Sequence, residues 1–276
     1  MSSFDAALDL LRRLDPTKVE KHLSQLIQLD PSLAEDLLSS VDTPLQVKKD
    51  PNAAQKEFLT CDYNRDIDSH RSPWSNQYVP PLSAADLEES PFPTAAVRRM
   101  EELANDSFDI YRELYYEGGV SSVYMWDLGD DVEDFAGVVL FKKSGQSKSS
   151  WDAIHVFEAL QGEDSRQWEY RVTTTIILHL DSGREAQLSG NLTRQTQKTE
   201  TKPVSVAQDT DAYKVWHISN LGSHIEAVES QMRTQLEVVY FDKTRDIYRE
   251  LRDPSVATAS DNRLAHEQVV KGLQGM

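Results

Sequence analysis

Apolar and polar side chains alternate in five short runs between residues 117 and 195, and these runs dominate the pattern of the chain. They cover Glu117–Leu128, Phe135–Lys143, Trp151–Gln161, Glu169–Asp181 and Glu185–Gln195, with a few polar residues or glycine between them. In the fourth run, Tyr170, Val172 and Ile176 fall on one face, and Arg171 and Thr173 fall on the other. The two-residue period and the short spacers predict a five-stranded antiparallel meander whose apolar face must be covered.

Two helical patterns flank the predicted strands. The first covers Thr94–Tyr116 and leads directly into the opening strand. The second begins at Val215 or Trp216 and runs to about Arg252, with apolar residues three or four positions apart. A helix of that length would extend roughly 50 Å and could cross the whole sheet. Gly222 within it is a weak point of the helix, of the kind tolerated where a backbone must pack closely.

The chain ends in a short tail beyond a helix stop. Asp253-Pro254 ends the long helix, and a small polar tether follows. The pattern over Arg263–Met276 is amphipathic but is weakened by Gly272 and Gly275. Such a tail is typically frayed, and the alternative is that it binds as a helix in a groove on another protein.

The first forty residues predict three short helices. Asp15-Pro16 and Asp30-Pro31 separate them, and in each pair Asp can cap a helix whose first turn contains Pro. Each helix has a single apolar stripe, and helices this short are stable only when packed on something else. We therefore expect either a partner chain or the rest of the protein to cover them.

Asp42 to Leu82 is rich in Pro, Asp, Asn and Ser and predicts an ordered loop region. Its acidic run begins like a calcium-binding loop, but Ile67 occupies the position that needs glycine and Pro73 the position that needs a bidentate Glu. We therefore expect its carboxylates to cap turns and to pair with Arg65 and Arg71, and we expect no metal site.

The predicted fold class is α+β: an N-terminal helical stalk, a five-stranded antiparallel meander sheet covered by one long C-terminal helix, and a short amphipathic tail helix. The expected parts are residues 1–45 for the stalk, 46–116 for the loop-rich region and connecting helix, 117–197 for the sheet, 213–252 for the long helix and 253–276 for a mobile tail.

Composition narrows the range of possible partners and compartments. The 276 residues carry a net charge of −17, which opposes nonspecific binding to nucleic acid or to an anionic membrane. Cys61 is the single cysteine, so an internal disulfide is excluded, and no apolar stretch is long enough for a membrane span or a signal peptide. These features favour a reducing cytoplasmic setting, with no nucleic-acid partner and no membrane insertion.

Motifs for catalysis are missing from the sequence. It contains no phosphate-binding glycine loop, no HExxH, no zinc-type Cys or His pair and no GxSxG turn. His155 and His179 lie within strand patterns, where a structural role is the commoner outcome. We therefore expect a non-enzymatic binding protein without a cofactor.

Several long sequence strings resemble the beta subunit of the heterodimeric F-actin capping protein. They are Glu35–Asp42 with Pro44-Leu45, Cys61–Asp66, Arg71–Asn76, Glu117–Leu128 and Leu192–Arg194. The resemblance implies an obligate heterodimer with a capping protein alpha subunit. It further implies that this dimer binds the barbed ends of actin filaments, independently of calcium, and blocks the addition and loss of subunits there.

The resemblance also implies an architecture and a location. The family has a helical stalk, a five-stranded sheet continued across the partner into a ten-stranded one, a long helix over it and a mobile C-terminal helix. The implied location is the cytoplasm and the actin cytoskeleton, in structures such as cortical patches. One alternative stays open: a non-enzymatic structural subunit of another actin-regulatory assembly, for example a dynactin-like or endosomal complex.

Two sets of site residues follow. Because actin is acidic, contact with it requires local basic and apolar side chains. The candidates are Arg233, which the resemblance favours, with Lys243, Arg245 and Arg249, and the tail residues Leu264, Val269, Val270 and Leu273. By analogy with the family, Asp62, Tyr63 and Asp66 are candidates for binding basic regulatory peptides of the capping-protein-interaction type.

Overall fold

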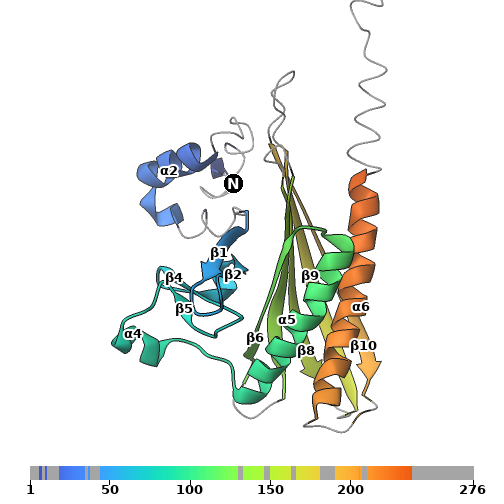
Figure 1. Ribbon diagram of the computed structural model, residues 1–276. Coiled ribbons are helices and arrows are strands. Elements are labelled where there is room, and N and C mark those ends of the chain that lie inside the picture. The colour runs from blue at the N-terminus through green and yellow to red at the C-terminus, as the bar shows by residue number, and fades with distance from the viewer. Residues whose placement is uncertain are drawn as a thin grey trace, which may run out of the picture. The chain divides into compact units, whose positions relative to one another are not determined.

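A computed structural model describes residues 6–7, 10, 19–34, 37, 44–129, 133–145, 150–162, 166–180, 190–204, 206 and 210–237. The chain divides into two compact units, Met1–Glu226 and Ala227–Met276, with the boundary inside a helix. The first unit contains the sheet and the surfaces considered below (Figure 1).

A five-stranded antiparallel sheet confirms the predicted meander. Its strands lie side by side in chain order, so each pairs with the next along the sequence. They are β6 (Val120–Asp127), β7 (Phe135–Ser144), β8 (Ser150–Gln161), β9 (Gln167–Leu180) and β10 (Gly190–Pro203). The last strand ends eight residues beyond the predicted Gln195, because Thr196–Pro203 continue the ladder opposite Gln167–Thr174. A run of polar residues beyond the predicted end therefore also pairs as a strand.

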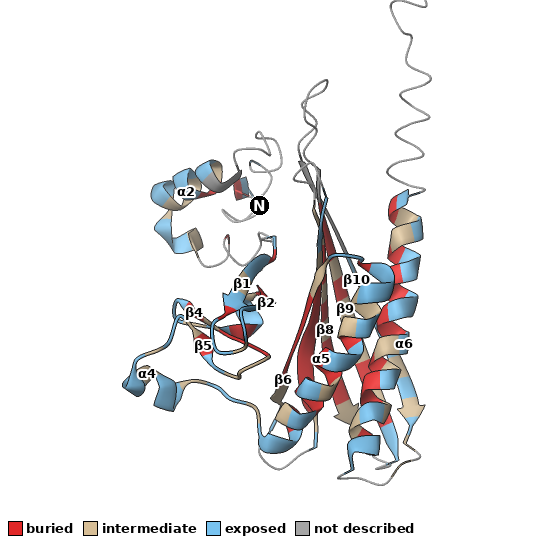
Figure 2. Cartoon of the chain, viewed as in Figure 1, coloured by how far each residue is buried: buried red, intermediate tan, exposed pale blue. Residues whose placement is uncertain are grey.

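One face of the sheet is the main core. Trp168, Tyr170, Val172 and Ile176 of β9 are buried on it, as their two-residue period predicted. His155 is also fully buried, with Nδ1 2.9 Å from Thr174 Oγ1, which confirms its structural role. The side chain of His179 lies outside the described part of the chain. Figure 2 shows how burial concentrates in these strands.

Helix α5 (Ala95–Tyr115) and the part of helix α6 (Asp211–Leu236) that belongs to the first unit lie over that face (Figure 1). Phe108 of α5 packs edge-on against Phe141 of β7. His217 of α6 packs edge-on against Trp168 of β9, with ring centroids 4.6 Å apart. The helix α6 begins at Asp211, earlier than predicted, because Thr210 accepts hydrogen bonds from the amides of the first turn. Its predicted continuation to Arg252 lies outside the described residues.

A hairpin covers part of the opposite face. It consists of β1 (Gln46–Asp50) and β2 (Lys56–Thr60), and Leu59 of β2 forms a buried cluster with Tyr124, Val138 and Leu140 of the sheet. The Tyr124 hydroxyl donates a 2.7 Å hydrogen bond to the Leu59 carbonyl. The expectation of a loop region was therefore wrong here. Strand β1 is lysine-rich and mostly exposed, so its sequence does not show the apolar alternation typical of a strand.

A small sheet and a short helix follow the hairpin. The strands β3 (Arg65–Asp66), β4 (Ser69–Arg71) and β5 (Tyr78–Val79) pair in chain order, and a 3-10 turn, η3 (Asp62–Asn64), precedes them. Helix α4 (Ala84–Glu89) then begins at the Ser83 cap, whose Oγ accepts from the Asp86 amide. No residue from Ser83 to Ala96 is buried, so this connection to α5 lies on the surface (Figure 2).

The N-terminal region has a small core of its own. Helix α2 (Val19–Leu29) is followed by a 3-10 turn, η2 (Pro31–Leu33), which Asp30 caps through the Ser32 amide, as predicted. Leu23, Leu37 and Ala7 are buried together. The stalk segments thus cover part of their apolar stripes within the chain, which the sequence did not predict.

Candidate protein-interaction surfaces

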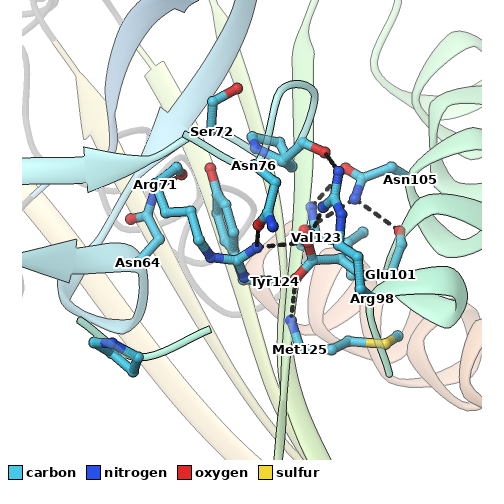
Figure 3. A network of polar contacts seen from close by, with 12 residues as sticks. Asn64, Arg71, Ser72, Asn76, Arg98, Glu101, Asn105, Val123, Tyr124 and Met125 are labelled. Carbon is cyan, nitrogen blue, oxygen red and sulfur yellow. Dashed lines mark hydrogen bonds and ion pairs between the residues drawn. The ribbon is translucent and has the colours of Figure 1, made fainter. Parts of the chain in front are cut away.

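A buried charge cluster organises the region between the small sheet and α5 (Figure 3). Arg71 of β4 makes a two-pronged contact with Glu101 of α5, with N–O distances of 2.8 and 2.7 Å. Arg98, one turn earlier on α5, pairs with the same carboxylate, and the Met125 amide of β6 donates to it over 2.7 Å. Because Glu101 is completely buried, all the compensation for its lost hydration comes from these donors.

The electrostatics of Arg71 follow from this arrangement. Burial by itself lowers the pKa of the guanidinium, but the hydrogen bonds and the negative charge of Glu101 outweigh burial and raise the pKa overall. A third contact, from Arg71 Nη1 to Asn76 Oδ1 over 2.7 Å, holds the turn between β4 and β5. Arg71 therefore stays charged and fixes its loop to α5.

Asn105 extends the cluster by one turn of α5. Its Nδ2 donates to the Glu101 and Val123 carbonyls, and its Oδ1 accepts from the Val123 amide. On the other side of the cluster, Asn64 donates to the Arg71 carbonyl over 2.9 Å. Figure 3 shows these groups converging from the loop, the helix and β6. Glu101 and Asn105 therefore join two of the sequence strings on which the resemblance rests, Arg71–Asn76 and Glu117–Leu128, and Asn64 links a third, Cys61–Asp66, to Arg71.

The acidic candidates Asp62, Tyr63 and Asp66 lie on η3 and β3, next to this cluster. Asp62 and Tyr63 are exposed, and the Tyr63 ring stacks on Trp126 of β6, nearly parallel at 5.5 Å between centroids. Asp66 is half-buried and accepts a 2.6 Å hydrogen bond from Ser90 Oγ. The structure thus places all three in one short segment, with Tyr63 held flat and Asp66 engaged in a contact with another part of the chain.

Two expectations about this loop need correction. Arg71 pairs with Glu101 rather than with the nearby aspartates, and Arg65 Nε donates to the Ile67 carbonyl instead. Ile67 adopts a φ of 51°, in the left-handed region that usually requires glycine in a hairpin turn. Among the described residues, no group of three His, Cys, Asp or Glu side chains could hold a metal ion.

A cavity of about 780 Å³ lies beside the acidic segment. Aromatic rings line much of it: Tyr63, Tyr78, Phe92, Trp126, Trp168 and Tyr213. Phe92 belongs to the connection after α4, is 42% exposed and packs edge-on against Tyr78. The exposed rings of Tyr63 and Phe92 lie close to the exposed carboxylate of Asp62, a combination suited to a basic chain with apolar side chains, while Arg65 and Lys214 also line the cavity.

The second surface is the outer edge of β10. This strand is fourteen residues long and is the last of its sheet, with β9 on one side. Its side chains from Gln195 to Pro203 are exposed or half-exposed and mostly polar. An edge of this length offers a row of backbone donors and acceptors for another strand.

Only one of the candidate actin contacts can be located. Arg233, near the end of α6, donates to Glu229 over 2.9 Å, and its side chain is 34% exposed whereas that of Glu229 is 1% exposed. Arg233 is thus partly occupied by an ion pair within its own helix. Lys243, Arg245, Arg249, Leu264, Val269, Val270 and Leu273 lie outside the described residues.

Two residues of this surface, Glu101 and Ser90, were not predicted from the sequence. Glu101 does carry a signal, because it lies on the buried stripe formed by Val97, Met100 and Ala104 of α5. A carboxylate on an apolar stripe indicates a buried partner, although the sequence does not say which arginine that is. The contact between Ser90 and Asp66 joins residues 24 positions apart and leaves no comparable signal.

An open strand edge and an acidic aromatic surface on a rigid frame define a binding subunit rather than an enzyme. The model of the family described as F-actin capping protein, beta subunit, matches residues 4–248. The chain therefore belongs to the beta-subunit family of F-actin capping protein. This is a family of structural actin-binding subunits, so the expectation of a non-enzymatic protein is confirmed.

Similar proteins agree along the whole chain. An F-actin-capping protein subunit beta from Candida glabrata is 57% identical over 274 residues, covering 99% of this chain and 98% of that one. One from Saccharomyces cerevisiae is 54% identical over 286 residues, covering 100% and 99%. Among solved structures, the homodimeric actin capping protein alpha subunit from Plasmodium berghei matches with a TM-score of 0.55 at 15% identity, covering 89% of this chain and 94% of that one. The structural likeness shows a shared fold. No helix in the described part of the chain is long and apolar enough to cross a membrane.

Proposed function

We propose that this chain pairs with a capping protein alpha subunit and that the heterodimer binds the barbed ends of actin filaments, where it blocks addition and loss of subunits. The observation that carries this proposal is the family match over residues 4–248, together with relatives that align along nearly the whole chain. The heterodimer acts in the actin cytoskeleton, including structures such as cortical patches.

The outer edge of β10 supports a specific way of pairing. A partner strand beside it would satisfy the backbone groups that alternate residues of β10 point away from β9, and it would extend the sheet without a break. The exposed polar side chains of Gln195–Pro203 imply that backbone hydrogen bonds, rather than a large apolar patch, determine the register.

Elongation of actin from barbed-end seeds tests the proposal. The heterodimer is obtained by co-expressing this chain with the alpha subunit. It should stop growth at these ends at substoichiometric amounts relative to actin. Growth from seeds whose barbed ends are already blocked should stay unchanged, which provides the control. Unaltered barbed-end growth at high heterodimer concentration would contradict capping and would favour a structural subunit of another actin-regulatory assembly.

The actin contact itself requires a local attraction, because both proteins are acidic overall. We assign the basic part of the contact to Arg233, Lys243, Arg245 and Arg249. The apolar part falls to the tail residues Leu264, Val269, Val270 and Leu273. Support for this assignment comes from their charge and spacing in the sequence.

The acidic segment at Asp62, Tyr63 and Asp66 is assigned to basic regulatory peptides of the capping-protein-interaction type. The exposed carboxylate of Asp62 and the stacked ring of Tyr63 support this, because they offer charge and a flat apolar surface side by side. Asp62→Lys should weaken binding of such a peptide and leave capping intact. Asp106→Lys, an equal change of charge at an exposed position of α5, is the matched control. Equal binding by Asp62→Lys and Asp106→Lys would exclude the acidic segment as the peptide site.

A further inference from the structure

A serine followed by proline joins the acidic segment to the surface connection after α4. The hydroxyl of Ser90 lies 2.6 Å from Asp66 Oδ2 and 2.8 Å from the Asp86 carbonyl, so this single group holds the end of α4 against β3. Further along the connection, Phe92 packs edge-on against Tyr78, the Tyr78 hydroxyl donates to the Pro91 carbonyl over 3.2 Å, and Thr94 donates two hydrogen bonds to Asp127. Because the connection buries no residue from Ser83 to Ala96, its position depends on such polar contacts.

The backbone at this point has the shape that a protein kinase binds. Ser90 is extended, with φ −69° and ψ 140°, and Pro91 restricts it to that region. Pro91 and Phe92 are exposed, and acidic residues of α4 precede them. A segment with so little buried surface can open locally without unfolding the sheet. We propose that Ser90 is a phosphorylation site for a proline-directed protein kinase and that its phosphorylation releases the connection from Asp66.

The chemistry of the release is explicit. The γ-phosphoryl group of ATP moves to Ser90 Oγ as the bond from phosphorus to the β,γ-bridging oxygen breaks; ADP leaves, and the hydroxyl proton passes to the base of the kinase. The resulting ester oxygen has no proton to donate to Asp66 or to the Asp86 carbonyl. A phosphate of charge about −1.5 to −2 then faces the Asp66 carboxylate, and like charges repel.

A second Ser-Pro pair provides an internal comparison. Ser72 precedes Pro73, but it is completely buried beside the Arg71 cluster. The folded protein should therefore withhold Ser72 from a kinase while it presents Ser90. A third pair, Thr43-Pro44, has its threonine outside the described residues.

The modification would also change the acidic segment, because Asp66 belongs to it. This consequence rests on the regulator site proposed above, whereas phosphorylation and release do not depend on it. Phosphorylation at Ser90 with unchanged peptide binding would therefore contradict the regulator site alone.

The test treats the heterodimer with ATP and a proline-directed kinase that accepts synthetic peptides of residues 67–78 and 85–96. Mass spectrometry should then find phosphate on Ser90 and none on Ser72. Ser90→Ala and Pro91→Ala heterodimers should lose that phosphate, and Ser83→Ala should retain it. Absence of phosphate on Ser90 in the wild-type heterodimer, or equal phosphorylation of Ser72, would overturn the site.

Hydrogen exchange tests the release. Loss of a hydrogen bond to a carboxylate should make amide exchange in residues 84–94 faster by roughly tenfold to a hundredfold after phosphorylation. Exchange in β8, remote from the site in sequence and in a central strand, should not change. Unchanged exchange in residues 84–94 would overturn the release, and so would slower exchange, which would mean that a cation such as Arg65 captures the phosphate.

Discussion

A carboxylate buried between two guanidinium groups adds little net stability, because all three ions have given up their water. Glu101 instead determines position: it ties Arg71 of the loop, Arg98 of its own helix and the Met125 amide of β6 to one point. The free energy of unfolding falls when one of these groups is removed, because the others are then left charged and buried. At the scale of single residues, this makes Glu101 a position that should be sensitive to substitution.

Glu101→Ala should lower the free energy of unfolding of the heterodimer by about 3–5 kcal/mol, because Arg71 is then buried without its counter-ion. The neighbouring Glu102 is a matched control. It pairs with Arg98 and Arg99 at the surface, its side chain is 45% exposed, and Glu102→Ala should cost less than about 1 kcal/mol. Denaturant unfolding of both variants measures the difference. Equal losses would show that the buried cluster relaxes or admits water.

At the scale of elements, two glycines differ in what surrounds them. A Cβ on Gly137 of β7 would lie 2.5 Å from the Phe157 ring and 2.6 Å from the Tyr124 carbonyl. A Cβ on Gly222 of α6 would meet nothing within 4 Å. The expectation that Gly222 marks close backbone packing was therefore wrong, and the close approach occurs instead inside the sheet at Gly137.

Gly137→Ala should destabilise the heterodimer by about 1–3 kcal/mol, because β7 cannot move away from both neighbours. Gly222→Ala should be neutral or stabilising by up to about 1 kcal/mol, since alanine favours the helix. Thermal unfolding under identical conditions compares the two. A larger loss for Gly222→Ala would mean that another molecule or segment occupies the space beside that glycine.

Two histidines, His217 of α6 and His70 of β4, also predict that the stability of the fold depends on pH. Burial lowers the pKa of His217 to about 3, and burial followed by the charges of Lys48 and Arg65 lowers that of His70 to about 4. Both rings are therefore neutral in the folded protein and gain a proton on unfolding below pH 6.5, the ordinary value. Their contribution to stability is complete above pH 6.5 and is lost as the pH falls toward the folded values.

We expect the unfolding free energy to decrease below pH 6.5 by as much as about 1.4 kcal/mol per pH unit for each histidine. His217→Phe keeps a ring between Trp168 and Tyr213 and removes one of these protons, so it should flatten the decrease. Chemical denaturation at a series of pH values measures the slope. A variant with the wild-type slope would show that His217 does not carry the effect.

The elements differ in how far the sequence predicts them. The strands β6 to β9 and helix α5 follow from their apolar residues, because each buries at least one face in this chain. Strand β1 and the end of β10 were missed because their exposed polar side chains carry no period, and β2 was missed because its apolar run is too short to show one. Asp62, Tyr63 and Asp66 were located as one segment, but the partners Glu101 and Ser90 depend on long-range packing that no local pattern contains.

At the scale of the whole molecule, the open edge of β10 and the exposed apolar residues leave surface for a partner. Leu114 of α5 is 73% exposed and Leu29 of α2 is 82% exposed. The side chains of β10 from Gln195 to Pro203 are mostly polar, so this edge is open to association through its unpaired backbone groups rather than through an apolar surface.

Expressed alone, this chain should aggregate, whereas co-expression with the alpha subunit should yield a soluble heterodimer. Size-exclusion chromatography with light scattering distinguishes the two. A soluble monomer that unfolds cooperatively would show that the covering surface lies within the chain.

The actin contact divides between encounter and retention. We assign Arg233 to the association step. Its ion pair with the buried Glu229 means that a charge-reversing substitution would change this pair as well as the contact with actin. Arg233→Glu should slow association, and part of that loss would come from two carboxylates placed together. Arg233→Gln removes the charge and keeps a donor for Glu229, so it isolates the electrostatic part, which salt should screen.

The tail acts after first contact. Burial of Leu264, Val269, Val270 and Leu273 in an actin groove would contribute a few kcal/mol at roughly 25 cal/mol per Å², less the cost of ordering the segment. Deleting Arg263–Met276 should therefore leave association and heterodimer stability unchanged and speed dissociation from barbed ends by roughly tenfold to a hundredfold. Dwell times on single filaments measure this dissociation rate. Arg233→Gln is the opposite case, in which association should change rather than dissociation. An unchanged dwell time after deletion would mean that this tail takes no part in holding the filament end.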